Sequence, residues 1–197
     1  MIETGAANIY IDPYKLHLLP KEELEYLEQH KADYIVITHT HGDHLSPNDI
    51  ALVKSSKTTI IAPPCCKSLK EWQQLSVGQK VTFDGIEFEA VAAYNTNKPF
   101  HTKEMGFIGV IITINGKRLY HAGDTDVIEE MSTYKNLDLA MIPVSGTYVM
   151  TADEAIVAAG KIEAKTFIPM HWGVDVGDKA MAEHFVANVK GAIMPSF

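Results

Sequence analysis

Four side chains of the kinds that bind metal ions stand within six residues, directly after the apolar run 34–37: His39, His41, Asp43 and His44. The run has the length of a buried strand, so these side chains are expected in the turn at its carboxyl end. Such a set suits zinc, manganese or iron, which accept neutral imidazole nitrogen and carboxylate oxygen. Gly42 gives this turn backbone freedom. The alternative, a solvated loop with chance histidines, leaves the clustering unexplained.

Strand-like apolar runs alternate with helical patterns along the rest of the chain. Asp84-Gly85 and Asn115-Gly116 are dipeptides that close two-residue hairpins, so the middle of the chain is expected to be antiparallel. Thr151 and Glu154 have the spacing of a capping box. The predicted strands cover residues 8–11, 34–38, 58–62, 79–83, 86–93, 106–114, 117–121, 137–142 and 166–169. The predicted helices cover residues 21–30, 47–54, 129–134, 151–161 and 178–189. This order favours an α/β architecture of sheets with helices outside them.

Composition and charge exclude several classes of protein. The 197 residues are 46% apolar, which is ordinary for a globular protein, and they are interpreted as one domain over residues 1–197. Seventeen basic against 25 acidic side chains give a net charge of −8, which disfavours nucleic acid and anionic membranes as partners. Neither a membrane-spanning run nor a secretory leader is recognisable. Cys65 and Cys66 are adjacent and form no disulfide framework, so a cytoplasmic location is expected. Formation of a homo-oligomer stays open.

The segment His39-Thr40-His41-Gly42-Asp43-His44 matches the HxHxDH signature of the metallo-β-lactamase superfamily, which the chain resembles from about residue 9 to its last helix. The resemblance implies an αβ/βα four-layer sandwich, in which two mixed β-sheets carry helices on their outer faces. The segments 123–126 (GDTD), 143–150 (PVSGTYVM) and 168–173 (IPMHWG) are similar to the branch that contains ascorbate-6-phosphate lactonase and other metal-dependent hydrolases. Family members usually begin with a further strand before the segment that matches 9–13, so a truncated N-terminal edge is expected.

The resemblance also assigns the later ligands. Asp124 matches the bridging aspartate of the family, and His171 matches its last histidine. The remaining histidine of the family ends the strand that matches residues 88–93, but here that point reads Tyr94-Asn95. The nearest histidine is His101, six residues beyond Asn95. We expect His101 to reach the site from the loop 95–104, with Asn95 as the alternative, an oxygen ligand.

By analogy, two divalent ions are expected, zinc or manganese, with iron as a further option. The first would be held by His39, His41 and His101, and the second by Asp43, His44 and His171, with Asp124 between them. Asp43 and Asp124 are the predicted catalytic carboxylates, although a loop residue could equally protonate the leaving group. Two cations lower the pKa of a shared water and so supply a hydroxide nucleophile at neutral pH. The expected activity is hydrolysis of a small ester, lactone or phosphoester. The alternative is a metal- or ligand-binding member of the fold without hydrolytic turnover.

Other residues have two interpretations on the sequence alone. Asp12 is either a carboxylate that orients a ligand or a turn former before Pro13. His121 either supports the metal ligands or points away from them. Adjacent Cys65 and Cys66 are interpreted as buried thiols. Surface or packing roles are expected for His17, His30 and His184. Substrate contacts or ordinary loop roles are open for Tyr94, Asn95, Ser145, Gly146, Thr147 and Tyr148.

Overall fold

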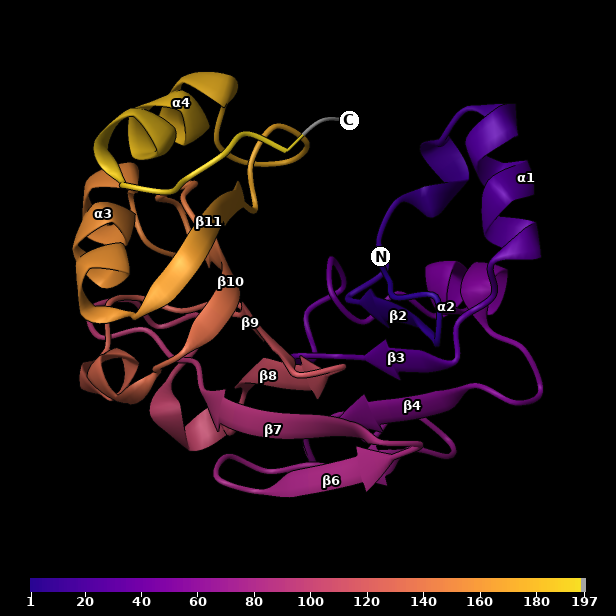
Figure 1. The fold of residues 1–197 in the computed structure, drawn as a ribbon. Coiled ribbons are helices and arrows are strands. Elements are labelled where there is room, and N and C mark those ends of the chain that lie inside the picture. The colour runs from indigo at the N-terminus through magenta and orange to yellow at the C-terminus, as the bar shows by residue number, and fades with distance from the viewer. Residues whose placement is uncertain (196–197) are drawn as a thin grey trace. The chain divides into compact units, whose positions relative to one another are not determined.

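The structure, a computed structural model, describes residues 1–195 and divides into two compact units, Met1–Ser76 and Val77–Phe197 (Figure 1). Each unit contains one mixed β-sheet, with five strands in the N-terminal unit and six in the C-terminal unit. Helices accompany both sheets, so the predicted α/β class with two mixed sheets is confirmed. No helix within residues 1–195 combines the length and the apolar character that crossing a membrane requires.

The sheet of the N-terminal unit is parallel in its centre. Its strands follow the chain order: β1 (Ile2–Glu3), β2 (Asn8–Ile11), β3 (Tyr34–Val36), β4 (Thr59–Ala62) and β5 (Gln73–Gln74). All three residues of β3 are buried, as its unbroken apolar sequence predicts for a strand between two parallel neighbours. β1 pairs antiparallel with β2, so the edge expected to be truncated carries a strand, although only a two-residue one.

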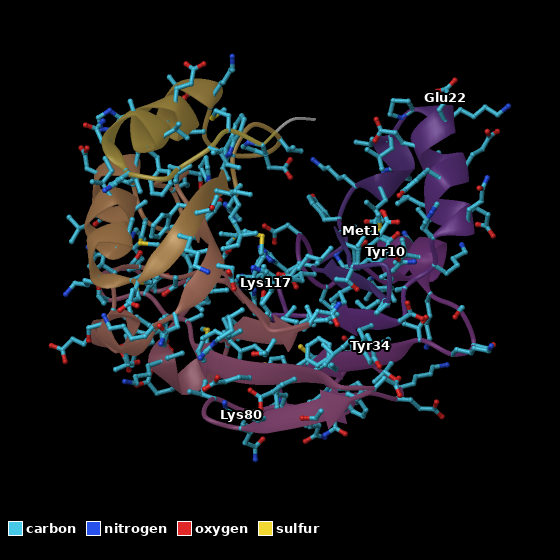
Figure 2. All side chains as sticks on the ribbon, viewed as in Figure 1. Met1, Tyr10, Glu22, Tyr34, Lys80 and Lys117 are labelled. Carbon is cyan, nitrogen blue, oxygen red and sulfur yellow. The ribbon has the colours of Figure 1, made fainter. Side chains whose placement is uncertain are left out.

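Three short helical elements belong to the N-terminal unit: η1 (Leu16–Leu18), α1 (Lys21–Gln29) and α2 (Pro47–Val53). The side chain of Ser46 caps α2 by accepting a hydrogen bond from the Asp49 amide, and Pro47 occupies the first turn, where its missing N–H costs nothing. Leu27 of α1 and Ile50 of α2 join the core with Ile35 of β3. Glu22 on the opposite face of α1 points to solvent (Figure 2).

The sheet of the C-terminal unit has the order β11-β10-β9-β8-β7-β6. Its strands are β6 (Lys80–Phe83), β7 (Ile86–Ala92), β8 (Ile108–Ile114), β9 (Lys117–His121), β10 (Leu137–Pro143) and β11 (Ala164–Met170). Both predicted hairpins are present, and Asp84 and Asn115 have the positive φ values, 49° and 50°, that such turns require. Lys80, labelled on β6 in Figure 2, pairs with Glu87 and Glu89 of β7.

Two α-helices and two short 3₁₀ elements complete the C-terminal unit: η2 (Lys103–Met105), η3 (Glu129–Thr133), α3 (Ala152–Lys161) and α4 (Lys179–Asn188). The capping box of α3 is confirmed, because Thr151 and Glu154 exchange side chain–backbone hydrogen bonds. Ala155 of α3 and Phe185 of α4 lie in one core with the sheet. The segment 129–134, predicted as an α-helix, is a 3₁₀ helix. Its five residues are too few to repay the nucleation of an α-helix.

Strand direction brings polar residues to one edge of each sheet. β2 and β3 run parallel, so the residues that follow them, Asp12 and the segment 37–44, leave at the same edge. In the C-terminal unit β9, β10 and β11 are parallel, and β7 runs in their direction because antiparallel β8 lies between β7 and β9. The carboxyl ends of parallel strands are where α/β proteins place their ligand sites.

Candidate metal centre

Asp12 is the organising carboxylate of the N-terminal unit. Its Oδ1 accepts a hydrogen bond from the Thr38 amide at 2.8 Å, and its Oδ2 accepts one from the Thr38 hydroxyl at 2.6 Å. The same Oδ2 lies 2.8 Å from Nδ1 of His44, with both side chains 7% exposed. A carboxylate is an acceptor, so Nδ1 of His44 donates and the lone pair of this imidazole lies on Nε2.

His39 is oriented through the same carboxylate. The hydroxyl proton of Thr38 is directed at Asp12, so Oγ1 of Thr38 accepts from Nδ1 of His39 at 2.9 Å. Asp12, His39 and His44 also lie close enough together to hold an ion. However, Nδ1 of His44 is hydrogen-bonded to Asp12, and Nδ1 of His39 to Thr38. We therefore interpret Asp12 as the residue that orients both rings rather than as a ligand.

The remaining donor atoms of the histidine segment face one another. Nε2 of His39 lies 3.1 Å from Nδ1 of His41, and the two rings meet edge to face. Oδ2 of Asp43 lies 3.5 Å from Nε2 of His44. The carboxylate of Asp43 is 40% exposed, whereas the side chain of His44 is buried. The predicted cluster thus offers two pairs of donor atoms for metal binding. One pair consists of two nitrogens, and the other of a nitrogen and an oxygen.

Asp124 is the buried carboxylate that faces histidines in the C-terminal unit. Its Oδ2 lies 3.3 Å from Nε2 of His101 and 3.4 Å from Nε2 of His171, and its side chain is 3% exposed. The turn that delivers it follows β9, where Nδ1 of His121 accepts a hydrogen bond from the Gly123 amide at 3.2 Å. His121 therefore shapes the turn that carries Asp124, which agrees with the first of its two interpretations, a supporting role. One oxygen of the Asp124 carboxylate thus lies near the Nε2 atoms of two imidazoles.

His171 follows β11 in an unusual backbone conformation. Its φ is 58°, in the left-handed region that non-glycine residues seldom adopt and that clusters at functional sites. Nδ1 of His171 lies 3.0 Å from the hydroxyl of buried Ser145, which follows the neighbouring strand β10. The hydroxyl of Ser145 thus holds one side of the ring, and Nε2 on the other side faces Asp124.

His101 reaches Asp124 from the loop, and Asn95 contacts the ring rather than the carboxylate. Oδ1 of Asn95 lies 3.0 Å from the amide nitrogen of His101 and 3.1 Å from its Nδ1. Buried Asp126 holds the loop, since the backbone amide of Thr96 and Nζ of Lys98 donate to its carboxylate at 2.9 and 2.5 Å.

The donor spacings within each unit fit metal binding. Tetrahedral zinc with nitrogen or oxygen donors at about 2.0–2.1 Å keeps those donors roughly 3.3 Å apart. The four facing pairs described above are separated by 3.1–3.5 Å. A lone pair on an imidazole nitrogen and a carboxylate oxygen repel each other at this distance unless a proton or a cation lies between them. The chemistry of the donor set therefore fits a divalent cation.

The loop residues considered for substrate contact divide into buried and exposed ones. Ser145 is buried against His171, and the hydroxyl of Tyr94 donates to Glu130 at 2.9 Å. Burial alone would raise the pKa of Glu130, but hydrogen bonds from Lys103 and Tyr94 outweigh it and lower that pKa. Tyr148 is exposed and packs edge to face on Phe100. Thr147 is exposed as well, and Gly146 has a φ of 75°.

Residues set aside on the sequence have ordinary roles. Cys65 and Cys66 are free thiols, and burial raises the pKa of both, so neither is a reactive thiolate at neutral pH. His17 contacts Asp49, His30 contacts the carbonyl of Tyr26, and His184 pairs with Asp153. The sequence did not identify Thr38, Asn95 and Ser145 as residues that orient histidine rings. Only the position of each at a strand end could have indicated them.

Comparisons with known proteins identify the family and the fold. The sequence matches the family model described as a beta-lactamase superfamily domain over residues 7–172. A UPF0173 metal-dependent hydrolase of Bacillus mycoides (strain KBAB4) is 31% identical over 185 residues, which cover 87% of this chain and 80% of the relative. A crystal structure assigned as a metal-dependent hydrolase of Parabacteroides distasonis ATCC 8503 has a TM-score of 0.80 and 35% identity, over 94% of this chain and 83% of that chain. Igni18, a metallo hydrolase of Ignicoccus hospitalis KIN4/I, shares the fold, with a TM-score of 0.77 and 23% identity over 99% and 89% of the two chains.

Proposed function

This chain belongs to the metallo-β-lactamase superfamily and is similar to its metal-dependent hydrolases, and we propose that it cleaves a small ester, lactone or phosphoester with two divalent ions. The family resemblance and the fold expected from the sequence are confirmed at this level. The narrower likeness to ascorbate-6-phosphate lactonase, the cytoplasmic location and the single-domain organisation stay predictions.

The observation that carries the proposal is the position of Asp124. Its Oδ2 faces Nε2 of His101 and Nε2 of His171 at 3.3 and 3.4 Å in a buried environment. A buried carboxylate needs compensation for its charge. Divalent cations held by this carboxylate and by the two imidazoles would supply that compensation. The two histidines would then belong to two different ions, as the sequence assignment has it.

The division of the donors between two ions is taken from the family resemblance. His39, His41 and His101 would hold the first ion. Asp43, His44 and His171 would hold the second, and Asp124 would contribute to both. Zinc and manganese suit these donors, and iron does as well. When bound, the ions would lower the pKa of a water molecule and stabilise the oxyanion that develops on the carbonyl or phosphoryl group of the substrate.

The chain's own residues then have to bind the ions, orient the ligands and carry a proton. Asp43 is the candidate for protonating the leaving group, because its carboxylate is 40% exposed while that of Asp124 is 3% exposed. Neither cysteine competes as a nucleophile, since burial raises the pKa of Cys65 and Cys66. The net charge of −8 favours a small substrate over a polyanionic one.

Metal content and activity measured together test the proposal. Wild type, His41→Ala and Asp124→Ala are purified, their metals are identified and counted by mass spectrometry, and hydrolysis is measured on a panel of esters, lactones and phosphoesters. His184→Ala is the matched control, because His184 pairs with Asp153 on the surface. We expect two ions per wild-type chain, loss of metal and of hydrolysis in the first two variants, and no change in the control.

Two outcomes would decide against the proposal. Full activity of Asp124→Ala or His41→Ala would show that the assigned ligands are not part of the catalytic centre. One ion per chain with no hydrolysis over the whole panel would favour the alternative from the sequence, a binding protein without turnover.

A further inference from the structure

Asn95 lies three residues after the end of β7, near the point where the resemblance leads one to expect a histidine. Asn95 is 7% exposed, and both its backbone amide and its side-chain amide form hydrogen bonds. The Asn95 amide donates to the carbonyl of His101 at 2.6 Å, and Oδ1 lies 3.0 and 3.1 Å from the His101 amide and from Nδ1 of the ring. Nδ2 donates to the carbonyl of Tyr148 at 3.0 Å. Asn95 therefore joins His101 to a second loop.

The orientation of this side-chain amide follows from its two backbone partners. A backbone N–H only donates and a carbonyl only accepts. Rotating the amide by 180° would set Nδ2 against the His101 N–H and Oδ1 against the Tyr148 carbonyl, and both contacts would be repulsive. Oδ1 therefore faces His101, and Nδ1 of His101 must carry the proton. The lone pair of that imidazole is then on Nε2, which faces Asp124 at 3.3 Å.

We propose that Asn95 is the positioning residue of His101: it fixes the ring and its Nδ1–H tautomer, so that a histidine six residues further along the loop presents Nε2 to a metal ion. The inference rests on the proposed function, in which His101 is a ligand of the first ion. It also replaces the earlier alternative of Asn95 as an oxygen ligand, because Oδ1 is occupied by two hydrogen bonds from His101.

The same loop offers a control that separates positioning of the ring from stiffness of the loop. Lys98 holds the loop through its 2.5 Å contact with Asp126. It does not contribute any of the hydrogen bonds that orient the imidazole of His101. Lys98→Ala therefore loosens the loop and leaves the tautomer of His101 alone. Asn95→Ala removes the acceptor from the ring. Asn95→Asp keeps an acceptor for both donors of His101 but loses the hydrogen bond to the Tyr148 carbonyl, so it separates the contact with the ring from the contact with the second loop.

The experiment measures metal affinity by competition with a chelator, using zinc as the probe, in the full-length protein. Asn95→Ala is expected to weaken one of the two zinc ions by about 10–100-fold, the usual effect of losing a partner that orients a ligand. Asn95→Asp and Lys98→Ala are expected to stay within a few-fold of wild type. Long-range proton–nitrogen NMR of the metal-free protein is expected to show Nδ1 of His101 protonated in wild type and in Asn95→Asp, whereas in Asn95→Ala the neutral ring is expected to carry its proton on Nε2, toward Asp124.

The failures of the two proposals are distinguishable. If His101→Ala retains both zinc ions at wild-type affinity, His101 is not a ligand and the proposed function is wrong at this position. If His101→Ala loses one ion but Asn95→Ala keeps both, with the proton still on Nδ1, the role of Asn95 is refuted. If Asn95→Ala does not fold, Asn95→Ser takes its place, because a serine hydroxyl is too short to span both donors of His101. Equal losses in Lys98→Ala and Asn95→Ala would also refute the inference, since loop stiffness would then explain both.

Discussion

Asp12→Asn tests how the N-terminal unit orients its ligands. The carboxylate accepts hydrogen bonds from the Thr38 amide, the Thr38 hydroxyl and Nδ1 of His44 at 2.8, 2.6 and 2.8 Å. Asparagine has nearly the same volume and tolerates the positive φ of 45° at this position. It has only one acceptor oxygen, however, so its NH₂ group must face the hydroxyl of Thr38 and the ring of His44. His44 can then form a hydrogen bond only as an acceptor at Nδ1, with its proton on Nε2.

The magnitude follows from this change of tautomer. A proton on Nε2 of His44 blocks the atom that faces Asp43. Losing such an orienting partner costs about 10–100-fold in metal affinity, which corresponds to about 1.4–2.7 kcal/mol. Asp12→Ala leaves three donors unpaired and adds a loss of stability of about 1–3 kcal/mol for each donor that stays buried. The asparagine variant should therefore lose metal with less loss of stability than the alanine variant.

The assay combines chelator competition with thermal unfolding of the metal-free protein. Asp33→Asn is the matched control. The carboxylate of Asp33 accepts a hydrogen bond from the Asn8 amide at 2.8 Å, and this hydrogen bond does not involve a histidine. We expect wild-type metal affinity in Asp33→Asn and the stated loss in Asp12→Asn. Wild-type affinity in Asp12→Asn would refute the reasoning, because it would mean that the tautomer of His44 does not depend on this carboxylate.

Further predictions concern stability. In Gly109→Ala the new Cβ would lie 2.8 Å from the carbonyl oxygen of Ala122, in the turn that delivers Asp124, so we expect a loss of about 1–3 kcal/mol and weaker metal binding. In Gly160→Ala the new Cβ meets open space in α3, so this substitution should instead stabilise the protein by about 0.5–1 kcal/mol. The unfolding temperature should therefore fall in Gly109→Ala and rise in Gly160→Ala. Shifts in the same direction would contradict the two predictions. The hydrogen bond from Lys165, followed by those from the Arg118 amide and Lys117, holds the pKa of Asp138 well below its usual range. Its stabilising effect is therefore complete above the unfolded pKa of about 3.9 and is lost as the pH falls toward the lower folded pKa. Urea midpoints of wild type should accordingly exceed those of Asp138→Asn at pH 7 and approach them in strong acid; a difference that does not depend on pH would contradict this.

Most of the fold could be predicted because its signals are local. The dipeptides Asp84-Gly85 and Asn115-Gly116 specify their turns through backbone conformation alone, and Thr151 with Glu154 specifies the start of α3. The two-residue strands β1 and β5 could not be predicted in this way. A strand of this length has no periodicity, and it is defined only by pairing with a neighbour from elsewhere in the chain.

The candidate site shows the same division. The dense cluster of candidate ligands after β3 is visible in the sequence, and the order of the later candidates follows from the family resemblance. The role of Asn95 could not be predicted, because an asparagine after a strand is equally compatible with a turn, a ligand or an orienting residue. Its hydrogen bonds to His101 and to Tyr148, which lies 53 positions further along the chain, distinguish these possibilities. Sequence patterns identify groups that bind metals, but not the groups that fix which atom binds.

The strand order explains how the protein supplies those orienting groups. Asp12 follows β2 and holds His44, which follows the neighbouring parallel strand β3. Ser145 follows β10 and contacts His171, which follows the neighbouring parallel strand β11. Adjacent strands lie about 4.8 Å apart, so a short oxygen-bearing side chain at one strand end can reach an imidazole at the next. Parallel pairing therefore positions each of these histidines together with its partner. His101 is oriented instead from within its own loop, because Asn95 at the beginning of that loop folds back onto the ring.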